Sequence, residues 1–173
     1  NITPDHLNRH HTMECYAHTK ERIAENQTKD DVCVLNMEDE ELYRFGRECK
    51  ASVVWFSSKR KPDKGAYLDG DDIRYTDGTQ DKLMLNIHDM NLLGTHNYEN
   101  VCAAIAMTKA VGIPDDIIIE QVKCFKAVEH RIEYVATKKG VWYYNDSKGT
   151  NPEASVKAIE AMVRPTILIG GGY

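Results

Sequence analysis

The sequence lacks the features of a membrane, secreted or nucleic-acid-binding protein. No apolar run approaches the about 18 residues that a membrane span needs, and no signal-peptide pattern is visible. Positive charge is in short supply, since 22 Lys and Arg face 27 Asp and Glu for a formal net charge of -5. This balance argues against a general role in binding nucleic acid or a membrane surface.

The chain also lacks a C-x-x-C pair, and its five cysteines are odd in number. Cys33, Cys102 and Cys124 lie among apolar residues, so we expect them to be buried as small hydrophobic side chains. This usage predicts a reducing compartment. No G-x-x-x-x-G-K-[ST] loop is present, so the main phosphate cradle of any nucleotide is expected outside these residues.

With 173 residues, 42% hydrophobic and 28% charged, the chain has the profile of a soluble globular protein of one or two domains. Its ends predict a piece excised from a longer protein. The run Asn1-Ile2-Thr3-Pro4 begins without methionine. A buried-type strand predicted at 166–169 leads into Gly170-Gly171-Gly172, where a further connection is expected.

Apolar periodicity predicts an α/β fold. A helix over 12–26 with Thr12 as a possible cap, a strand over 32–36, a helix over 38–49 and a strand over 52–57 form two β-α-β-like steps. Such steps are typical of a parallel sheet covered by helices.

The following stretch differs, because Asp69-Gly70 and Asp77-Gly78 are hairpin signals between short apolar runs. They predict a small antiparallel meander attached to the sheet. Further along, the pattern predicts helices over 97–111 and 115–125, a hairpin of 131–137 and 141–145, and a helix over 153–162. We expect a domain boundary between residues 127 and 128, which divides the chain into 1–127 and 128–173.

The most informative segment is the run Asn145-Asp146-Ser147-Lys148-Gly149-Thr150-Asn151-Pro152. It places a carboxylate, an ammonium group and two hydroxyls in one strand-to-helix turn. A helix N-terminus offers free N–H groups and a dipole that favour anions. The simpler interpretation is a polar loop with Asn151 as N-cap and Pro152 at the first helical position.

Four other features could carry chemistry. His6 and His10 have the i, i+4 spacing of two zinc ligands, but no Glu follows the first His, so surface histidines at a helix entry are favoured. Lys20 by itself indicates a solvated helix face. Asn97 and Asn100 could read a base edge, although Asn97 could simply cap its helix. The pair His130-Arg131 lies at the predicted junction, where an arginine pairs with an acid or clamps a nucleotide.

In order along the chain, these features resemble the Mur ligases, the ATP-dependent amide-forming enzymes of peptidoglycan precursor synthesis. Residues 1–10 are similar to the family's Asn-x-x-x-Asp-His-hydrophobic-x-Arg segment, and residues 16–23 resemble the helix that presents a carbamylated lysine. His96-Asn97-Tyr98-Glu99-Asn100 matches His-Asn-x-x-Asn, and His130-Arg131 matches the junction His-Arg. The run Asp-Ser-Lys-x-Thr-Asn resembles the members that add D-glutamate.

The resemblance covers the whole chain and implies a fold. It implies a central ATPase-type parallel sheet with helices and a small antiparallel meander, incomplete here, followed by the start of a Rossmann-like C-terminal domain. It implies a bacterial cytoplasmic enzyme whose partners are UDP-N-acetylmuramoyl-L-alanine, D-glutamate and the remaining domains of the same chain. The chain alone is expected to be inactive, because the phosphate loop lies outside it.

The resemblance also implies roles for single residues, with ATP and Mg2+ as cofactors. His6 and a carbamylated Lys20 would hold the metal. The nucleotide and amino-acid roles fall on six more residues: Asn97 and Asn100 for adenine, Arg131 and Asp146 for the rest of the nucleotide, Lys148 for the phosphates, and Lys148 and Thr150 for the incoming amino acid. Two alternatives stay open: another Mur or folylpolyglutamate-type ligase, and a nonenzymatic zinc- or nucleotide-binding module.

Overall fold

The computed structural model describes residues 1–4, 7–126 and 128–171. In this range five strands form one sheet in the order β1-β2-β3-β4-β5. They are β1 (Val32–Asn36), β2 (Ser52–Ser57), β3 (Gly65–Asp69), β4 (Asp72–Thr76) and β5 (Asp81–Asn86). Strands β1, β2 and β3 are parallel, and β3, β4 and β5 are antiparallel. The prediction of a parallel sheet with an attached meander is therefore confirmed.

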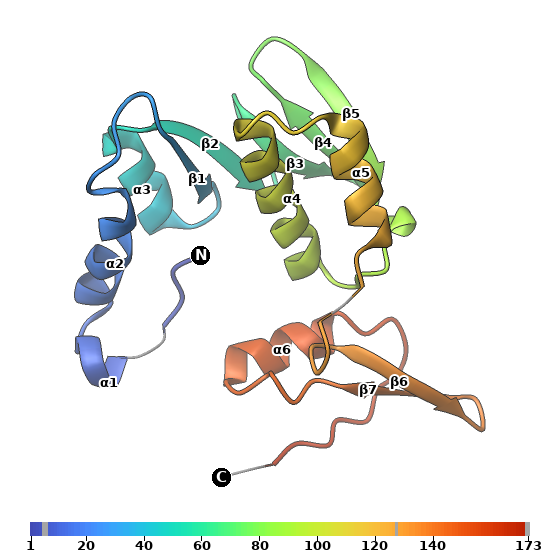
Figure 1. The fold of residues 1–173 in the computed structure, drawn as a ribbon. Helices are drawn as coiled ribbons and strands as arrows, with labels where there is room; N and C mark the ends of the chain where they lie inside the picture. The colour runs from blue at the N-terminus through green and yellow to red at the C-terminus, as the bar shows by residue number, and fades with distance from the viewer. Residues whose placement is uncertain (5–6, 127, 172–173) are drawn as a thin grey trace.

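The helices cover this sheet as Figure 1 shows. Helix α4 (Thr95–Ala110) contacts β1 to β4, α5 (Asp115–Cys124) packs on α4 and β5, and α3 (Glu40–Glu48) packs on β1. The chain starts with α1 (Leu7–His10), α2 (Met13–Glu21) and the 3-10 turn η1 (Arg22–Ala24), and a second such turn, η2 (Ile87–Asp89), follows β5. We call residues 1–4 and 7–126 the sheet unit.

Successive residues of the parallel strands supply two different cores. Val34 and Val54 face the core under α4 and α5, whereas Cys33 and Leu35 join a second core with residues of α3. Side chains of a strand alternate between its faces, so a strand covered on both sides is apolar throughout. This explains why the runs at 32–36 and 52–57 show no alternation of apolar and polar residues.

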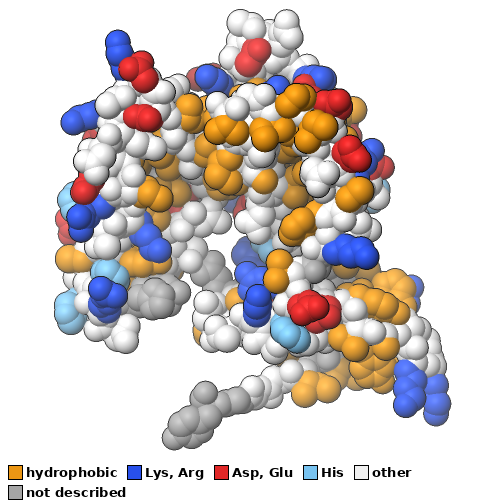
Figure 2. Space-filling view, in the orientation of Figure 1, with side chains coloured by type: hydrophobic (Ala, Val, Ile, Leu, Met, Phe, Trp, Pro, Cys, Tyr) orange, Lys and Arg blue, Asp and Glu red, His pale blue; other side chains and the backbone are white. Residues whose placement is uncertain are grey.

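The remaining elements are β6 (Glu133–Lys138), β7 (Val141–Asn145) and α6 (Pro152–Glu160). Strands β6 and β7 form an antiparallel hairpin with a register shift between Tyr134 and Ala136. We call residues 128–171 the hairpin unit, which lies below the start of α4 in Figure 1. Figure 2 shows hydrophobic side chains gathered over this unit, where Tyr134, Trp142 and Tyr143 are exposed.

Several boundaries follow the prediction closely. Thr12 caps α2 by accepting a hydrogen bond from the N–H of Cys15 at 3.1 Å, although the helix is shorter than predicted and gives way to η1. Helix α4 begins two residues before the predicted start, at Thr95. The predicted domain boundary touches residue 127, which lies outside the described residues.

Two expectations are wrong. No strand forms at 166–169 in the described chain, and Ile167 and Ile169 are 90% and 92% exposed. An apolar run becomes a strand only when a neighbour satisfies its backbone groups, and the described residues provide none there. Cys124, the last residue of α5, is exposed, whereas Cys33 and Cys102 are buried as expected. Within the described ranges no helix has both the length and the apolar character needed to cross a membrane.

Candidate functional site

The turn between β7 and α6 is built around the predicted helix cap. Asn151 accepts a hydrogen bond from the N–H of Ala154 at 2.8 Å, and Pro152 takes the first helical position. Within the turn, the N–H of Gly149 donates to the carbonyl of Asp146 at 2.8 Å, and the N–H of Ser147 donates to Oδ1 of Asn145 at 3.0 Å. The capping prediction is confirmed, and the turn is held by its own backbone.

Gly149 allows the Asp146 side chain to fold back over the turn. A Cβ at position 149 would lie 2.5 Å from Oδ2 of Asp146 and 3.1 Å from its carbonyl oxygen. Any other residue would displace the carboxylate, so the glycine leaves the room that the carboxylate occupies.

The same turn is joined to the junction ahead of β6. The N–H of Lys148 donates to the carbonyl of His130 at 3.0 Å, and the N–H of Ile132 donates to Oδ1 of Asp146 at 3.1 Å. His130 and Ile132 have φ of 68° and 48°, which non-glycine residues adopt only when their surroundings impose it. Arg131 lies between them, so its backbone is fixed on both sides.

Helix α4 meets the hairpin unit at its first turn. Gly94 precedes the helix with φ 91°, and a Cβ there would lie 2.7 Å from Cβ of Ala161, just after α6. Ala161 is buried. Nδ2 of Asn97 donates to the carbonyl of Leu93 at 2.6 Å, so Asn97 stabilises the segment just before α4.

A cavity of about 220 Å³ opens where the two units meet. The residues that line it come from the first segment, from the first turns of α4 and from the hairpin unit: Asn1, Thr3, His96, Glu99, Asn100, Arg131, Ile132, Asp146, Asn151, Ala154 and Lys157. Three predicted site residues therefore lie together here, namely Asn100, Arg131 and Asp146. Asn97, Lys20, Lys148 and Thr150 do not line the cavity.

The cavity lies at the carboxyl ends of the parallel strands, the edge where open α/β sheets bind ligands. Asn36 ends β1, and its Nδ2 donates to Oδ1 of Asn1 at 2.6 Å. Ser58 follows β2, and its hydroxyl donates to Oε1 of Glu99 at 2.5 Å. These two bonds fix one wall of the cavity to the ends of two strands.

The charges around the cavity influence His96. Burial lowers the pKa of the His96 imidazole, and the positive charges of Arg131 and Lys157 lower it further, while Glu99 and Asp146 act in the opposite direction. His96 is therefore favoured in its neutral form, in which one ring nitrogen can accept a hydrogen bond and the other can donate one.

Sequence reasoning assigned no role to His96, Glu99 or Lys157. A signal for the first two was present, because residues three and four apart on a helix share a face: His96 lies four residues before the predicted site residue Asn100, and Glu99 lies three residues after His96. Lys157 had no comparable signal, since its place depends on how α6 packs beside α4.

The predicted metal residues are not brought to this cavity. His6 lies outside the described residues. Lys20 is exposed, with Nζ 5.4 Å from the centroid of the Tyr16 ring. In residues 1–4, 7–126 and 128–171, no group of three or more His, Cys, Asp or Glu side chains could hold a metal ion.

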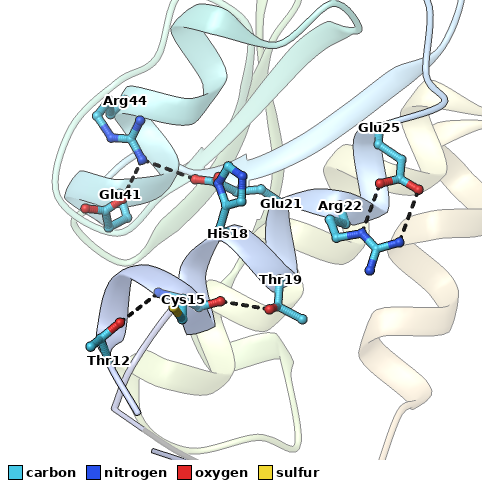
Figure 3. Close-up of polar contacts among 9 residues, drawn as sticks. All are labelled: Thr12, Cys15, His18, Thr19, Glu21, Arg22, Glu25, Glu41 and Arg44. Carbon is cyan, nitrogen blue, oxygen red and sulfur yellow. Dashed lines mark hydrogen bonds and ion pairs between the residues drawn. The ribbon is translucent and has the colours of Figure 1, made fainter. Parts of the chain in front are cut away.

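Helix α2, which carries Lys20, is joined to α3 by a shared carboxylate. Glu21 accepts from Nδ1 of His18 at 3.2 Å and from Arg44 at 3.3 Å, as Figure 3 shows. The bond between Glu21 and Arg44 therefore holds α2 beside α3.

A wider groove of about 780 Å³ runs along α3 and contains none of the predicted site residues. Three arginines and three glutamates contribute to its lining, and Arg60 is already bound to Glu38 at 3.2 Å and to the carbonyl of Met37 at 2.6 Å. Its opposite charges neutralise one another, so the smaller cavity between the units is the better candidate site.

Comparison with known proteins agrees with this geometry. Residues 1–108 match the family model of the Mur ligase middle domain. The chain belongs to the Mur ligase family.

Relatives of this Mur ligase chain share one name. The chain is 83% identical, over its whole length, to the UDP-N-acetylmuramoylalanine--D-glutamate ligase of Lachnospira eligens, and 52% identical to that of Lachnoclostridium phytofermentans. In both comparisons it spans 38% of the relative's length. Among solved structures, MurF from Acinetobacter baumannii superposes with a TM-score of 0.73 at 15% identity, over 96% of this chain and 36% of that one. The last likeness concerns the fold alone.

Proposed function

We propose that this chain is part of an ATP-dependent ligase that adds D-glutamate to UDP-N-acetylmuramoyl-L-alanine. The single observation that carries the proposal is the turn Asp146-Ser147-Lys148-Gly149-Thr150-Asn151, whose aspartate lines the cavity between the two units. The names of relatives up to 83% identical support the same substrates. The activity belongs to the longer protein, since the chain spans 38% of those relatives.

The reaction explains why such a site needs both cations and fixed donors. A carboxylate is a poor electrophile, so one of its oxygens first attacks the γ-phosphorus of ATP, and ADP leaves as an acyl phosphate forms. The amine of D-glutamate then attacks the acyl carbon, loses a proton and expels phosphate. Negative charge accumulates in both steps and must be stabilised by groups that are already in place.

The cavity residues suit the nucleotide. Asn100 offers amide donors and a carbonyl acceptor to a base edge. Asp146, held by the N–H of Ile132, can accept hydrogen bonds from ribose hydroxyls, and Arg131 can neutralise phosphate oxygens. Asn97 does not line the cavity, and its Nδ2 donates to the carbonyl of Leu93, so we propose for the base only its Oδ1, and only in the closed enzyme.

Lys148 and Thr150 are exposed on the turn and stand outside the cavity. We propose that Lys148 neutralises the phosphates and that the hydroxyl of Thr150 donates to the D-glutamate carboxylate. Closure of the two units would complete this part of the site.

Mg2+ would neutralise phosphate oxygens when bound. The described residues do not assemble a metal shell, and Lys20 is exposed rather than buried. Carbamylation requires a neutral amine, which burial would favour. The described residues leave Lys20 exposed, so they do not by themselves favour its neutral form. His6 and a carbamylated Lys20 remain proposals for magnesium, and no step above is assigned to the metal. A bacterial cytoplasmic location remains part of the same proposal.

The test is phosphate release by the full-length protein supplied with ATP and UDP-N-acetylmuramoyl-L-alanine. D-glutamate should stimulate release, whereas L-glutamate, meso-diaminopimelate and D-alanyl-D-alanine should not. Stimulation by another amino acid would identify a different Mur ligase, and turnover of a folate with L-glutamate would identify a folylpolyglutamate-type enzyme. Stoichiometric zinc without any turnover would support a binding module instead.

A further inference from the structure

Glu99 is oriented by a residue far away in the sequence. Its Oε1 accepts the hydroxyl proton of Ser58 at 2.5 Å across a separation of 41 residues, and the bond is partly buried. Among the described residues that line the cavity, the sheet unit contributes one carboxylate, that of Glu99. Helix α4 and the end of β2 therefore hold this carboxylate at the cavity wall.

The second oxygen of Glu99 is available to a ligand. Across the described chain, no hydrogen-bond donor pairs with Oε2. An ionised carboxylate can only accept hydrogen bonds, and it repels phosphate. The wall formed by Glu99 therefore suits an uncharged part of a ligand that carries N–H or O–H donors.

The size and charge of the cavity indicate which part of a nucleotide this is. Its about 220 Å³ is less than the roughly 300–1,000 Å³ of pockets for drug-sized ligands, so it fits part of a nucleotide. Arg131 and Lys157 provide cationic groups for phosphates, and Glu99 and Asn100 both line the cavity from the start of α4. Asp146 already offers a carboxylate to the ribose hydroxyls, so we assign the second carboxylate of the cavity, that of Glu99, to the donors of the base.

We propose that Glu99 selects adenine, with Oε2 accepting a hydrogen bond from the exocyclic amino group. This rests on the proposed function, which assigns a nucleotide to the cavity. Adenine presents a donor at this position, whereas guanine and hypoxanthine present an oxo acceptor. A carboxylate repels an oxo group, so it favours ATP over nucleotides with a 6-oxo purine.

The test compares ATP with inosine triphosphate, which carries an oxo group in place of the amino group, in the full-length ligase. Glu99→Gln keeps Oε1 as the acceptor for Ser58 and puts an amide N–H in the place of Oε2, where it can donate to the oxo group. We expect the preference for ATP, measured as the ratio of kcat/KM values, to fall at least about tenfold. Ser58→Ala should lower it by less, Ser58→Thr should keep it, and Glu120→Gln, an exposed residue of α5, should not change it.

The alternatives give distinct results. Equal losses of kcat/KM for both nucleotides in Glu99→Gln, with thermal unfolding unchanged, would overturn base selection, because Glu99 would then contribute to nucleotide use without reading the base. If Glu99→Gln changes kcat/KM only for 2′-deoxy-ATP relative to ATP, base selection is overturned, because Glu99 would then contact the ribose. If the wild-type ligase uses ATP with D-glutamate and the preference survives in every variant, the proposed function stands and this inference fails. If wild type shows no such turnover, the proposed function itself fails.

Discussion

The carboxylate of Asp146 accepts a hydrogen bond from the backbone N–H of Ile132 at 3.1 Å. This contact joins the turn before α6 to the junction that carries Arg131, so two predicted nucleotide residues move as one piece. The position of Asp146 relative to Arg131 depends on how tightly the turn before α6 is folded. A mutation in that turn can therefore change it.

Gly149→Ala should displace Asp146. The added Cβ would lie 2.5 Å from Oδ2, so the carboxylate must move and its bond to the N–H of Ile132, worth about 0.5–1.5 kcal/mol, is weakened. We expect a higher KM for ATP in the full-length enzyme and a lower free energy of unfolding. Gly170→Ala is the matched control, because a Cβ there meets nothing within 4 Å. Equal behaviour of the two variants would contradict the packing argument.

Gly94→Ala should weaken the contact between α4 and α6. Positive φ makes alanine costly at this position, and the new Cβ would also meet Cβ of Ala161 at 2.7 Å. Gly112→Ala shares the positive φ but has open space around it, so it measures the cost of a positive φ without the clash. Urea unfolding should show Gly94→Ala to be the less stable by about 1–3 kcal/mol. The idea fails if the two variants unfold together.

Acid should weaken the meander through Asp81. Hydrogen bonds from Lys61, Tyr67 and Arg74 lower the pKa of this carboxyl to about 2, from an ordinary value of 3.8. A carboxyl whose pKa is lowered by folding stabilises the fold at pH values above its pKa in the unfolded chain. This contribution is lost as the pH falls from about 4 towards 2. Asp81→Asn should remove that part of the pH dependence of stability, while Asp63→Asn, at an exposed position, should retain it. Chemical denaturation at pH 2 to 7 would measure both.

Lys148→Ala should reduce the rate far more than the stability. The side chain is exposed, and exposed substitutions usually change stability by less than about 0.5 kcal/mol. Loss of a group that stabilises charge in the transition state costs roughly 100-fold or more in kcat. Lys139→Ala, at the exposed tip of the hairpin, serves as the control in the phosphate-release assay. A normal kcat in Lys148→Ala would remove this lysine from the proposed site.

Local signals in the sequence predicted most elements. The caps Thr12 and Asn151 act within three residues of themselves, and the Asp-Gly turns lie between strands that pair with their neighbours. Such features need no knowledge of the tertiary fold.

Long-range features were beyond the sequence. The Ser58–Glu99 bond spans 41 residues, and Lys157 reaches the cavity only through the packing of α6. The run at 166–169 has strand composition but no pairing partner in the described chain, so composition alone misled. The places of Lys148 and Thr150 outside the cavity likewise depend on how the two units meet.

The carboxamide at the end of β1 determines how that strand aligns. Because both faces of β1 are apolar, a slip by one residue would replace one set of aliphatic side chains with another and meet little resistance. Asn36 is 6% exposed, and it bonds Asn1 and the N–H of Glu38. A slipped strand would put Leu35 in its place and lose both hydrogen bonds, at about 0.5–1.5 kcal/mol each. A single buried polar residue thus specifies the alignment that the hydrophobic pattern leaves ambiguous.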